Sequence, residues 1–337
     1  MRTAAFSPPA AGEAANTLYL GDNLEILRTL IPEKSADLIY LDPPFNSAGK
    51  YALAAGNGNG ARPVVFTDSW RWSEQAERDF QAMLEEKGAA AETARALRSF
   101  LHESGLAAYL FMAARRLLAL REILKPTGSL YLHCDPTAGH YLKIVADSVF
   151  GLKNFRNEII WHYTGGGRSK SRFSRKHDCI YLYADGKQQY FNPDPIRIPY
   201  KLTSGYAKSG ITSRAGRRYL PDPRGTPPDD VWDIPIINPL SRERIGYPTQ
   251  KPPALLERII QASSAEGDTV LDPFCGSGTT LRAAQKLGRR WIGIDNAPLA
   301  VEYSARRLRE AFPGMRFALR NASGNELFPE TGVQALC

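Results

Sequence analysis

Residues 37–47 read Asp-Leu-Ile-Tyr-Leu-Asp-Pro-Pro-Phe-Asn-Ser and join a short apolar run to a rigid turn. The run predicts a buried parallel strand that ends at Asp42. Pro43 and Pro44 have no N–H and a fixed φ, so neither a helix nor sheet pairing continues past them. A carboxylate, a carbonyl and the ring of Phe45 are therefore held at the carboxyl end of a strand, where open α/β sheets bind ligands.

This arrangement suits recognition of a flat molecule that carries an amino group. The Asp42 carboxylate and the Pro43 carbonyl can accept both hydrogens of an exocyclic NH₂, and Phe45 can stack on the ring. An Asp-Pro-Pro tripeptide is short, however, and a rigid surface turn after a core strand explains it equally well. Other parts of the chain have to decide between these two interpretations.

A βαβ unit with a ligand-binding turn is predicted near the carboxyl end of the chain. A strand over 269–272 leads into a glycine-containing turn and a helix, and a strand over 291–295 follows. The glycines let a ligand approach the backbone, and Asp295 can accept both hydroxyls of a ribose. Gly276 and Gly278 lack the third glycine of the dinucleotide fingerprint, which favours a nucleoside ligand without a pyrophosphate.

The elements that position these residues alternate as in an α/β protein. Strands are expected at 18–20, 37–41, 129–135, 158–163, 178–183, 269–272 and 291–295. Helices are expected at 24–30, 138–149, 254–263 and 297–312, within 73–124, and from the glycine-containing turn up to 287. Asp22 follows the first strand and so lies at a strand end that can border the same crevice. Asn23 is expected to cap the next helix, and residues 48–70 to form a long loop.

A basic, glycine-rich segment predicts contact with a polyanion. From His162 to Gly246 the chain holds 15 Lys+Arg and 8 Asp+Glu, so nearly the whole formal net charge of +8 lies there. Within it, residues 164–176 suit a mobile loop that grips phosphates. Its basic residues are Arg168, Lys170, Arg172, Arg175 and Lys176. A solvated loop explains any one of these charges but not the set.

The composition is that of an ordinary globular protein, with 337 residues of which 43% are hydrophobic and 23% charged. The amino terminus has no sustained apolar core and does not resemble a signal peptide. No stretch approaches the roughly 20 apolar residues of a membrane span. The four cysteines are scattered without paired spacing, which indicates a reducing cytoplasm, no disulfide framework and no zinc site.

Together the motifs resemble those of the β-class amino-directed DNA methyltransferases, which methylate adenine N6 or cytosine N4. Residues 271–279, Leu-Asp-Pro-Phe-Cys-Gly-Ser-Gly-Thr, look like their S-adenosylmethionine-binding motif, and Asp-Pro-Pro-Phe at 42–45 like their catalytic motif. Tyr-Pro-Thr-Gln-Lys-Pro at 247–252 resembles the segment before the cofactor motif, and 161–166 and 176–181 resemble further family blocks. The resemblance covers most of residues 17–312, and the order of motifs is that of the permuted β class.

The resemblance implies a fold and a division of the chain. The fold is a seven-stranded, mostly parallel sheet with helices on both faces and a circularly permuted motif order. Residues 17–161 are the expected catalytic half, with a helical insertion at 73–124, and residues 246–320 the cofactor-binding half. Between them, residues 162–245 are the expected target-recognition region, an irregular module that binds DNA.

The resemblance also assigns roles to individual residues. The catalytic residues are Asp42, Pro43, Pro44 and Phe45. S-adenosyl-L-methionine is the implied cofactor, with Asp22 near its adenine, Asp295 at its ribose and the others towards its methionine part. The cofactor-binding set is Asp22, Thr249, Lys251, Asp272, Phe274, Gly276, Gly278, Thr279 and Asp295.

The expected reaction is methylation of adenine N6 in duplex DNA, with the target base flipped out and stacked on Phe45. Cytosine N4 needs the same two acceptors; within the family, Asp at the first motif position leans towards adenine. Methylation of a protein glutamine and a non-catalytic DNA-binding relic are further candidates. The first would leave the basic module unexplained, and the intact motifs disfavour the second. Cys275 has no recognisable basic partner, which counts against carbon-5 cytosine methylation.

The expected partners follow from the same reasoning. Double-stranded DNA is the main one, and the basic module would hold it. The family resemblance implies a homodimer, with the helices in 73–124 as a contact surface, and admits a cognate restriction enzyme. No membrane association is expected.

Overall fold

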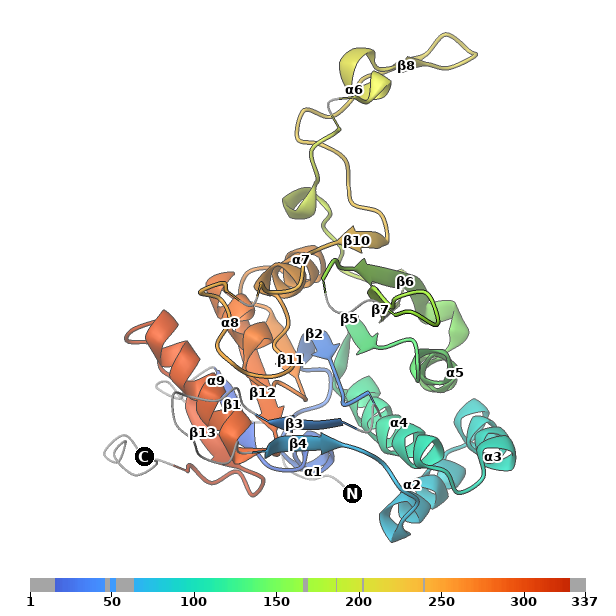
Figure 1. The fold of residues 1–337 in the computed structure, drawn as a ribbon, viewed down its shortest axis with the longest axis vertical. Coiled ribbons are helices and arrows are strands. Elements are labelled where there is room, and N and C mark those ends of the chain that lie inside the picture. The colour runs from blue at the N-terminus through green and yellow to red at the C-terminus, as the bar shows by residue number, and fades with distance from the viewer. Residues whose placement is uncertain are drawn as a thin grey trace.

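The computed structural model describes residues 16–45, 49–52, 64–165, 169–185, 187–201, 203–238 and 240–327. Its centre is a nine-stranded sheet in the order β10-β6-β7-β5-β2-β11-β12-β1-β13 (Figure 1). The strands are β1 Thr17–Leu20, β2 Ala36–Leu41, β5 Leu124–Cys134, β6 Phe155–His162, β7 His177–Ala184, β10 Val231–Asp233, β11 Thr269–Asp272, β12 Arg290–Asp295 and β13 Ala318–Asn321. From β5 to β13 all neighbours are parallel, and β7 runs antiparallel to β5 and β6.

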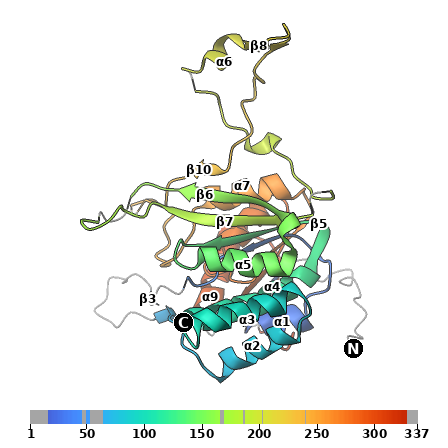
Figure 2. The same cartoon turned by 90° about the vertical axis from the view of Figure 1, so that its right-hand side faces the viewer.

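Helices cover both faces of this sheet (Figures 1 and 2). The helices of the described residues are α1 Asn23–Thr29, α2 Glu74–Glu85, α3 Ala89–Leu101, α4 Gly105–Ile123, α5 Gly139–Phe150, α6 Gly205–Ser209, α7 Pro253–Ser263, α8 Thr279–Lys286 and α9 Pro298–Ala311, with the 3₁₀ turns η1 Leu152–Asn154 and η2 Asp194–Ile196. Of these, α6 and η2 lie away from the sheet faces (Figure 1). In β2, Ile39 and Leu41 pack with α1, α4 and α5, and Leu38 and Tyr40 with α7, α8 and α9. This strand alternates its side chains between two apolar layers, which is why its sequence is apolar throughout.

The seven expected strands all form and lie in the main sheet, but the expected strand count is wrong. β13 adds a parallel strand beside β1 at one edge, and β10 adds one beside β6 at the other. These strands have four and three residues. β11 is equally short but fully buried, whereas most residues of β10 and β13 are not buried, so no apolar run marks these two strands in the sequence.

Two local predictions also need correction. Asp22, not Asn23, caps α1, because its carboxylate accepts hydrogen bonds from the backbone N–H groups of Leu24 and Glu25. The expected long loop at 48–70 contains an antiparallel hairpin, β3 Gly49–Ala52 with β4 Val64–Asp68. The glycine-rich stretch between these strands lies outside the described residues.

The irregular region expected after β7 forms an arm that projects from the body of the molecule (Figures 1 and 2). It carries η2, α6 and a hairpin of β8 Ile211–Thr212 with β9 Arg218–Tyr219. The arm returns through β10, where Trp232 is in register with Trp161 of β6. The range 162–245 therefore contributes two strands, β7 and β10, to the main sheet.

The described helices include none that is long and apolar enough to cross a bilayer.

Candidate active site

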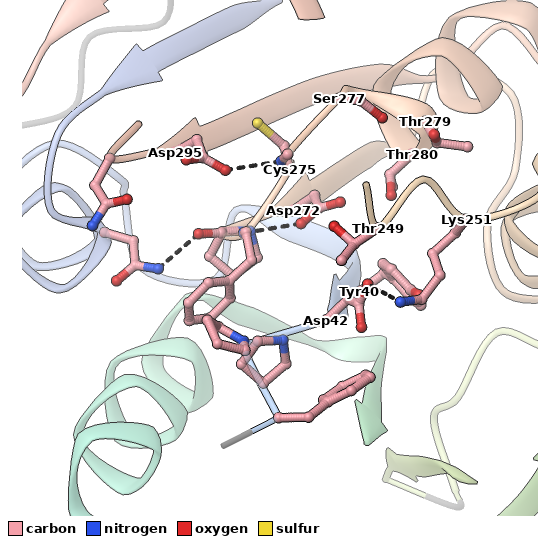
Figure 3. A pocket seen from close by; sticks show the side chains of 18 of the residues that line it. Tyr40, Asp42, Thr249, Lys251, Asp272, Cys275, Ser277, Thr279, Thr280 and Asp295 are labelled. Carbon is pink, nitrogen blue, oxygen red and sulfur yellow. Dashed lines mark hydrogen bonds and ion pairs between the residues drawn. The ribbon is translucent and has the colours of Figure 1, made fainter. Parts of the chain in front are cut away.

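A cavity of about 250 Å³ opens at the carboxyl ends of β2, β11 and β12 (Figure 3). These strands are neighbours and parallel, so the acids at their ends converge on one edge of the sheet. The expected residues that line the cavity are Asp22, Asp42, Pro43, Pro44, Phe45, Thr249, Lys251, Asp272, Phe274, Gly276, Thr279 and Asp295. Gly278 is the one expected cofactor residue outside this lining.

Asp42 directly follows β2 and uses its two carboxylate oxygens differently. Oδ2 pairs with the Lys251 ammonium at 2.7 Å (Figure 3). Oδ1 is buried, has no hydrogen-bond partner among the described residues, and lies 3.6 Å from Nδ1 of His133. A buried carboxylate oxygen without a donor is costly, so Oδ1 is an acceptor ready for a ligand or a proton.

Lys251 forms an ion pair with Asp42, although the resemblance assigned this lysine to the methionine part of the cofactor. Its ammonium also lies 5.1 Å from the centroid of the Phe45 ring, within cation–π range. The Lys251 ammonium thus lies beside both Asp42, the expected acceptor for an exocyclic amino group, and Phe45, the expected stacking partner of a base. Its role in cofactor binding stays a prediction.

Both the backbone and the ring of Phe45 contact other residues of the protein. Its backbone N–H donates to Asp68 Oδ2 at 3.1 Å, which ties the turn after β2 to the end of β4. Its ring centroid lies 5.6 Å from that of His133. The aromatic face beside Asp42 is therefore fixed by a carboxylate and an imidazole that the sequence motif does not contain.

On the other side of the cavity, Asp295 at the end of β12 is bound by backbone groups. Its Oδ2 accepts from the Gly276 N–H and its Oδ1 from the Ala297 N–H, both at 2.9 Å. Burial raises the pKa of Asp295, and these backbone hydrogen bonds oppose the rise. Each oxygen keeps a lone pair that can accept a ligand hydroxyl.

Asp272 at the end of β11 lies between Asp42 and Asp295. Burial raises its pKa to about 7, with the charges of Asp42 and Asp295 acting in the same direction. The Thr280 hydroxyl and the Phe274 N–H, the latter at 3.0 Å, oppose the shift. The cavity as a whole is lined by five Asp side chains against one Arg and one Lys. This excess of carboxylates favours a cationic ligand.

Asp22 has hydrogen-bond partners within the protein itself. Besides capping α1, it accepts from Arg116 Nη2 at 2.9 Å. Arg116 also donates through Nε to Asn23 Oδ1 at 2.5 Å, and Asn23 donates to the Pro273 carbonyl at 2.7 Å. Burial lowers the pKa of Arg116, and the Asp22 charge opposes this. This chain of contacts joins α4 and α1 to the turn after β11.

The glycine turn is shaped by packing as well as by ligand access. Gly278 has φ +73°, and a Cβ there would lie 2.7 Å from Ser304 Oγ on α9. Burial lowers the pKa of Arg307 to about 10, and its guanidinium donates to the Ser277 carbonyl and hydroxyl and to the Thr279 hydroxyl. α9 thus supports the turn from behind. Cys275, inside the turn, is buried, and burial raises its pKa well above the ordinary value, which disfavours a thiolate nucleophile.

The basic loop 164–176 joins β6 to β7, beside the hydrogen-bonded pair of Tyr163 and Asp178. Lys170 and Arg172 are exposed. Arg175 donates to the Thr137 hydroxyl at 3.2 Å, and Lys176 to the Gly165 carbonyl, so these two contact the protein itself. Arg168 lies outside the described residues.

The structure adds residues that the motifs did not indicate. Further lining residues with polar or aromatic groups are Asn23, Tyr40, Asp68, Trp70, Arg116, Tyr247, Ser277, Thr280 and Asn296. Behind Asp42 lies His133, which is bonded to Tyr40 and Asp178. One signal was available in the sequence, because His133 and Arg116 are polar residues inside apolar runs.

Solved structures of DNA methyltransferases share the fold of this chain. Structures with this fold include the PvuII DNA methyltransferase, described as cytosine-N4-specific, with a TM-score of 0.55 and 15% sequence identity over 91% of this chain and 96% of that one. TTHA0409 from Thermus thermophilus, solved in complex with S-adenosyl-L-methionine, gives a TM-score of 0.50 and 19% identity over 91% and 98% of the two chains.

Sequence comparison specifies the family. The N6/N4 DNA methylase family model matches residues 36–306. The Type II methyltransferase M.HpaI of Haemophilus parainfluenzae is 30% identical over 88% of this chain and 75% of its own length. The DNA adenine methyltransferase YhdJ of Escherichia coli is 30% identical over 91% and 87% of the two chains. The chain therefore belongs to the adenine-N6/cytosine-N4 family of DNA methylases, as the sequence motifs predicted.

Proposed function

We propose that this DNA methyltransferase transfers a methyl group from S-adenosyl-L-methionine to the N6 amino group of an adenine flipped out of duplex DNA at a specific site. The observation that carries the proposal is the state of Asp42. One of its oxygens is buried without a hydrogen-bond donor among the described residues, at the carboxyl end of a parallel strand and beside Phe45. Such an oxygen is an acceptor for an exocyclic amino group.

The chemistry needs this acceptor because an exocyclic base nitrogen is a poor nucleophile. Its lone pair is delocalised into the ring, and two acceptors on its hydrogens favour a pyramidal nitrogen with a localised lone pair. Asp42 and Pro43 both line the cavity, and we assign the Asp42 carboxylate and the Pro43 carbonyl as those acceptors. The methyl carbon then has to lie in line, about 3 Å from the nitrogen. Asp42 also stabilises the positive charge that develops there.

The cofactor fits the opposite side of the cavity. Asp295 has oxygens that can accept the ribose hydroxyls, and Asp22 and Asn296 border the space beyond it. S-adenosyl-L-methionine carries a sulfonium and an ammonium, and the excess of carboxylates in the lining suits these charges. When bound, the cofactor supplies an activated methyl group; the protein supplies its orientation.

Adenine is preferred to cytosine on two grounds. Asp at the first position of the catalytic motif leans towards adenine within the family that the chain resembles. YhdJ, which shares 30% identity over most of both chains, is named as an adenine enzyme. The alternative is cytosine N4, with the same mechanism and the same residues. The PvuII enzyme is cytosine-N4-specific but supports a shared fold only.

A base inside a duplex cannot reach Asp42, so the target has to leave the stack and lie against Phe45. The basic loop and the projecting arm are the parts that we assign to DNA. Lys170 and Arg172 of the loop are exposed, and the arm adds Arg214, Arg217 and Arg218 around its hairpin. Contacts of such side chains with phosphates give affinity, and groove contacts give specificity.

Methylation-sensitive sequencing of DNA from a host that expresses the protein tests this function. N6-methyladenine in one sequence context is the expected result, and N4-methylcytosine would select the alternative. DNA from cells that express an Asp42→Ala variant is the control. Absence of any new methylated base with a folded, cofactor-binding protein would contradict the proposal.

We further propose that the enzyme acts in the cytoplasm as a homodimer, with a cognate restriction enzyme as a second functional partner. The helical layer α2–α4 remains the proposed contact surface. Phe100 on α3 is 55% exposed and contacts the ring of Tyr141 on α5, which gives this side of the molecule an apolar spot. Light scattering at working concentration should give the mass of a dimer, and a monomer mass would contradict this part.

A further inference from the structure

His133 lies directly behind Asp42 although nothing in the motifs joins them. It is the last residue but one of β5 and is completely buried. β5 is the parallel neighbour of β2, and Leu132 is in register with Leu41. The next residue on each strand, His133 and Asp42, is therefore held at the same level of the sheet.

The hydrogen bonds of His133 define which of its nitrogens can gain a proton. Nε2 lies 3.2 Å from Asp178 Oδ2, and Asp178 also accepts from the Tyr163 hydroxyl at 3.2 Å. Burial opposes ionisation of Asp178, but the hydrogen bond from His133 and the charges of His133 and Lys251 hold its pKa below the usual value. An ionised carboxylate only accepts hydrogen bonds, so Nε2 carries a hydrogen.

The other nitrogen, Nδ1, faces the reaction side. The Tyr40 hydroxyl lies 2.8 Å from it, and burial raises the pKa of Tyr40 well above the ordinary value, so this hydroxyl keeps its proton. In the neutral ring, Tyr40 donates to Nδ1; when Nδ1 is protonated, the hydroxyl can rotate and accept instead. Asp42 Oδ1 is the other group near Nδ1, at 3.6 Å.

We propose that His133 receives, by way of Asp42, the proton that the target nitrogen loses on methylation. This step rests on the proposed function. The nitrogen forms a bond to the methyl carbon while the carbon–sulfur bond breaks and its electron pair stays on sulfur. The nitrogen is then positively charged, and one N–H proton passes to Asp42 and from Oδ1 to Nδ1 of His133. The base is left neutral, Asp42 is again ionised, and the ring of His133 carries the positive charge.

The surroundings of His133 suit this charge. Asp178 is negatively charged on the far side of the ring and favours its protonated form. The rings of Phe45 and Trp161 lie 5.6 and 5.5 Å away, centroid to centroid, and shield the path from water. Lys251 holds the second oxygen of Asp42, so that Oδ1 is the oxygen left for the transfer. His133 thus acts through Asp42 and does not touch the base.

The test is a single-turnover assay of methyl transfer from labelled S-adenosyl-L-methionine to unmethylated DNA, measured as a function of pH. His133→Gln keeps a donor towards Asp178 but cannot take up a proton. We expect a rate about 100-fold below the wild type. Because glutamine has no ionisable group, the pH profile of the variant should differ in shape from that of the wild type. Affinity for DNA and the stabilisation by the cofactor should not change.

His140→Gln is the matched control, because His140 is an exposed histidine on α5, and its rates should equal those of the wild type. Asp178→Asn provides a second variant if His133→Gln does not fold. It removes the negative charge beside the ring and keeps a hydrogen-bonding partner for Nε2, so the rate of methyl transfer should fall while the stabilisation by the cofactor does not change. A rate for His133→Gln within threefold of the wild type would overturn the relay, as would an equal loss at every pH. If wild-type protein transfers no methyl group, the proposed function fails instead.

Discussion

The two sides of the cavity hold their carboxylates in different ways. On the side assigned to the cofactor, Asp295 accepts from the backbone N–H groups of Gly276, in the turn after β11, and of Ala297, in the turn after β12. Asp272 accepts from the backbone N–H of Phe274 and from the Thr280 hydroxyl. On the base side, Asp42 is surrounded by side chains, with Lys251 on one oxygen and His133 near the other. Backbone donors are present whatever side chains the turn carries, whereas each contact of Asp42 depends on one particular residue.

This difference corresponds to two tasks. Under the proposed function, the side of Asp272 and Asp295 binds the same cofactor in every turnover, and preformed backbone donors achieve this without rearrangement. The base side has to accept a base, stabilise a developing charge and dispose of a proton. A carboxylate with one unpartnered oxygen and a nearby imidazole can change its partners during that sequence. Substitutions on the base side should therefore affect the reaction, and those on the cofactor side should affect binding.

The largest expected effect is that of Asp42→Ala. Because Asp42 is assigned to the base, methyl transfer should fall by at least about 1,000-fold. The increase in melting temperature caused by S-adenosyl-L-methionine should be nearly unchanged. The measurements are a methyl-transfer assay and thermal unfolding with and without cofactor. Near-normal turnover by the variant would remove the distinction between the two sides.

Asp295→Ala tests the opposite side. Loss of the ribose contacts should raise the Kd of the cofactor about tenfold or more, which lowers its stabilisation by about 1.4 kcal/mol at saturating concentrations. Asp268→Ala is the control, because Asp268 also accepts from a backbone N–H, that of Ala265 at 2.7 Å, but does not line the cavity. It should destabilise the free protein and leave the cofactor shift intact. Stabilisation by nicotinamide dinucleotide instead of S-adenosyl-L-methionine would refute the cofactor assignment.

The basic loop should contribute to DNA affinity alone. The triple substitution of Arg168, Lys170 and Arg172 by Ala should weaken binding to all duplexes. For the two described residues, the double change of Lys170 and Arg172 should lower the slope of log K against log salt by about 1.8. The control is the double change of the exposed Lys87 and Arg95 on the helical layer, which should leave the slope unchanged. If the loop variants methylated a different sequence with equal affinity, these residues would read bases.

The smallest expected effect is a pH dependence from Asp272. Its folded-state pKa of about 7 lies above the ordinary value, so the folded protein binds a proton more tightly than the unfolded chain. The stability contributed by Asp272 therefore falls as pH rises from about 4 to about 7. Asp272→Asn, which keeps an acceptor for the Phe274 N–H, should raise the melting temperature at pH 8 by a few degrees more than at pH 5. Equal changes at both pH values would contradict the shift.

Much of this molecule could be read from local patterns. The seven central strands, most of the helices and the acids at the ends of β2, β11 and β12 were predicted, because apolar runs and turn residues within ten positions determine them. The edge strands β10 and β13 were missed because most of their residues are not buried, so no apolar run marks them as it marks the equally short β11. The cap of α1 was placed one residue late because Asp22 and Asn23 are both good caps, and the choice depends on which residue keeps an extended conformation.

By itself, the sequence determined that an acid, two prolines and a phenylalanine follow a buried strand and that a glycine turn follows another. Only the tertiary structure decided what surrounds Asp42. His133 and Asp178 meet behind Asp42 because β5 lies between β2 and β7 in the sheet. Lys251 reaches Asp42 from a third segment, the one that precedes α7. The order of strands results from packing the whole chain on two apolar layers, and no local pattern specifies which neighbour a strand acquires.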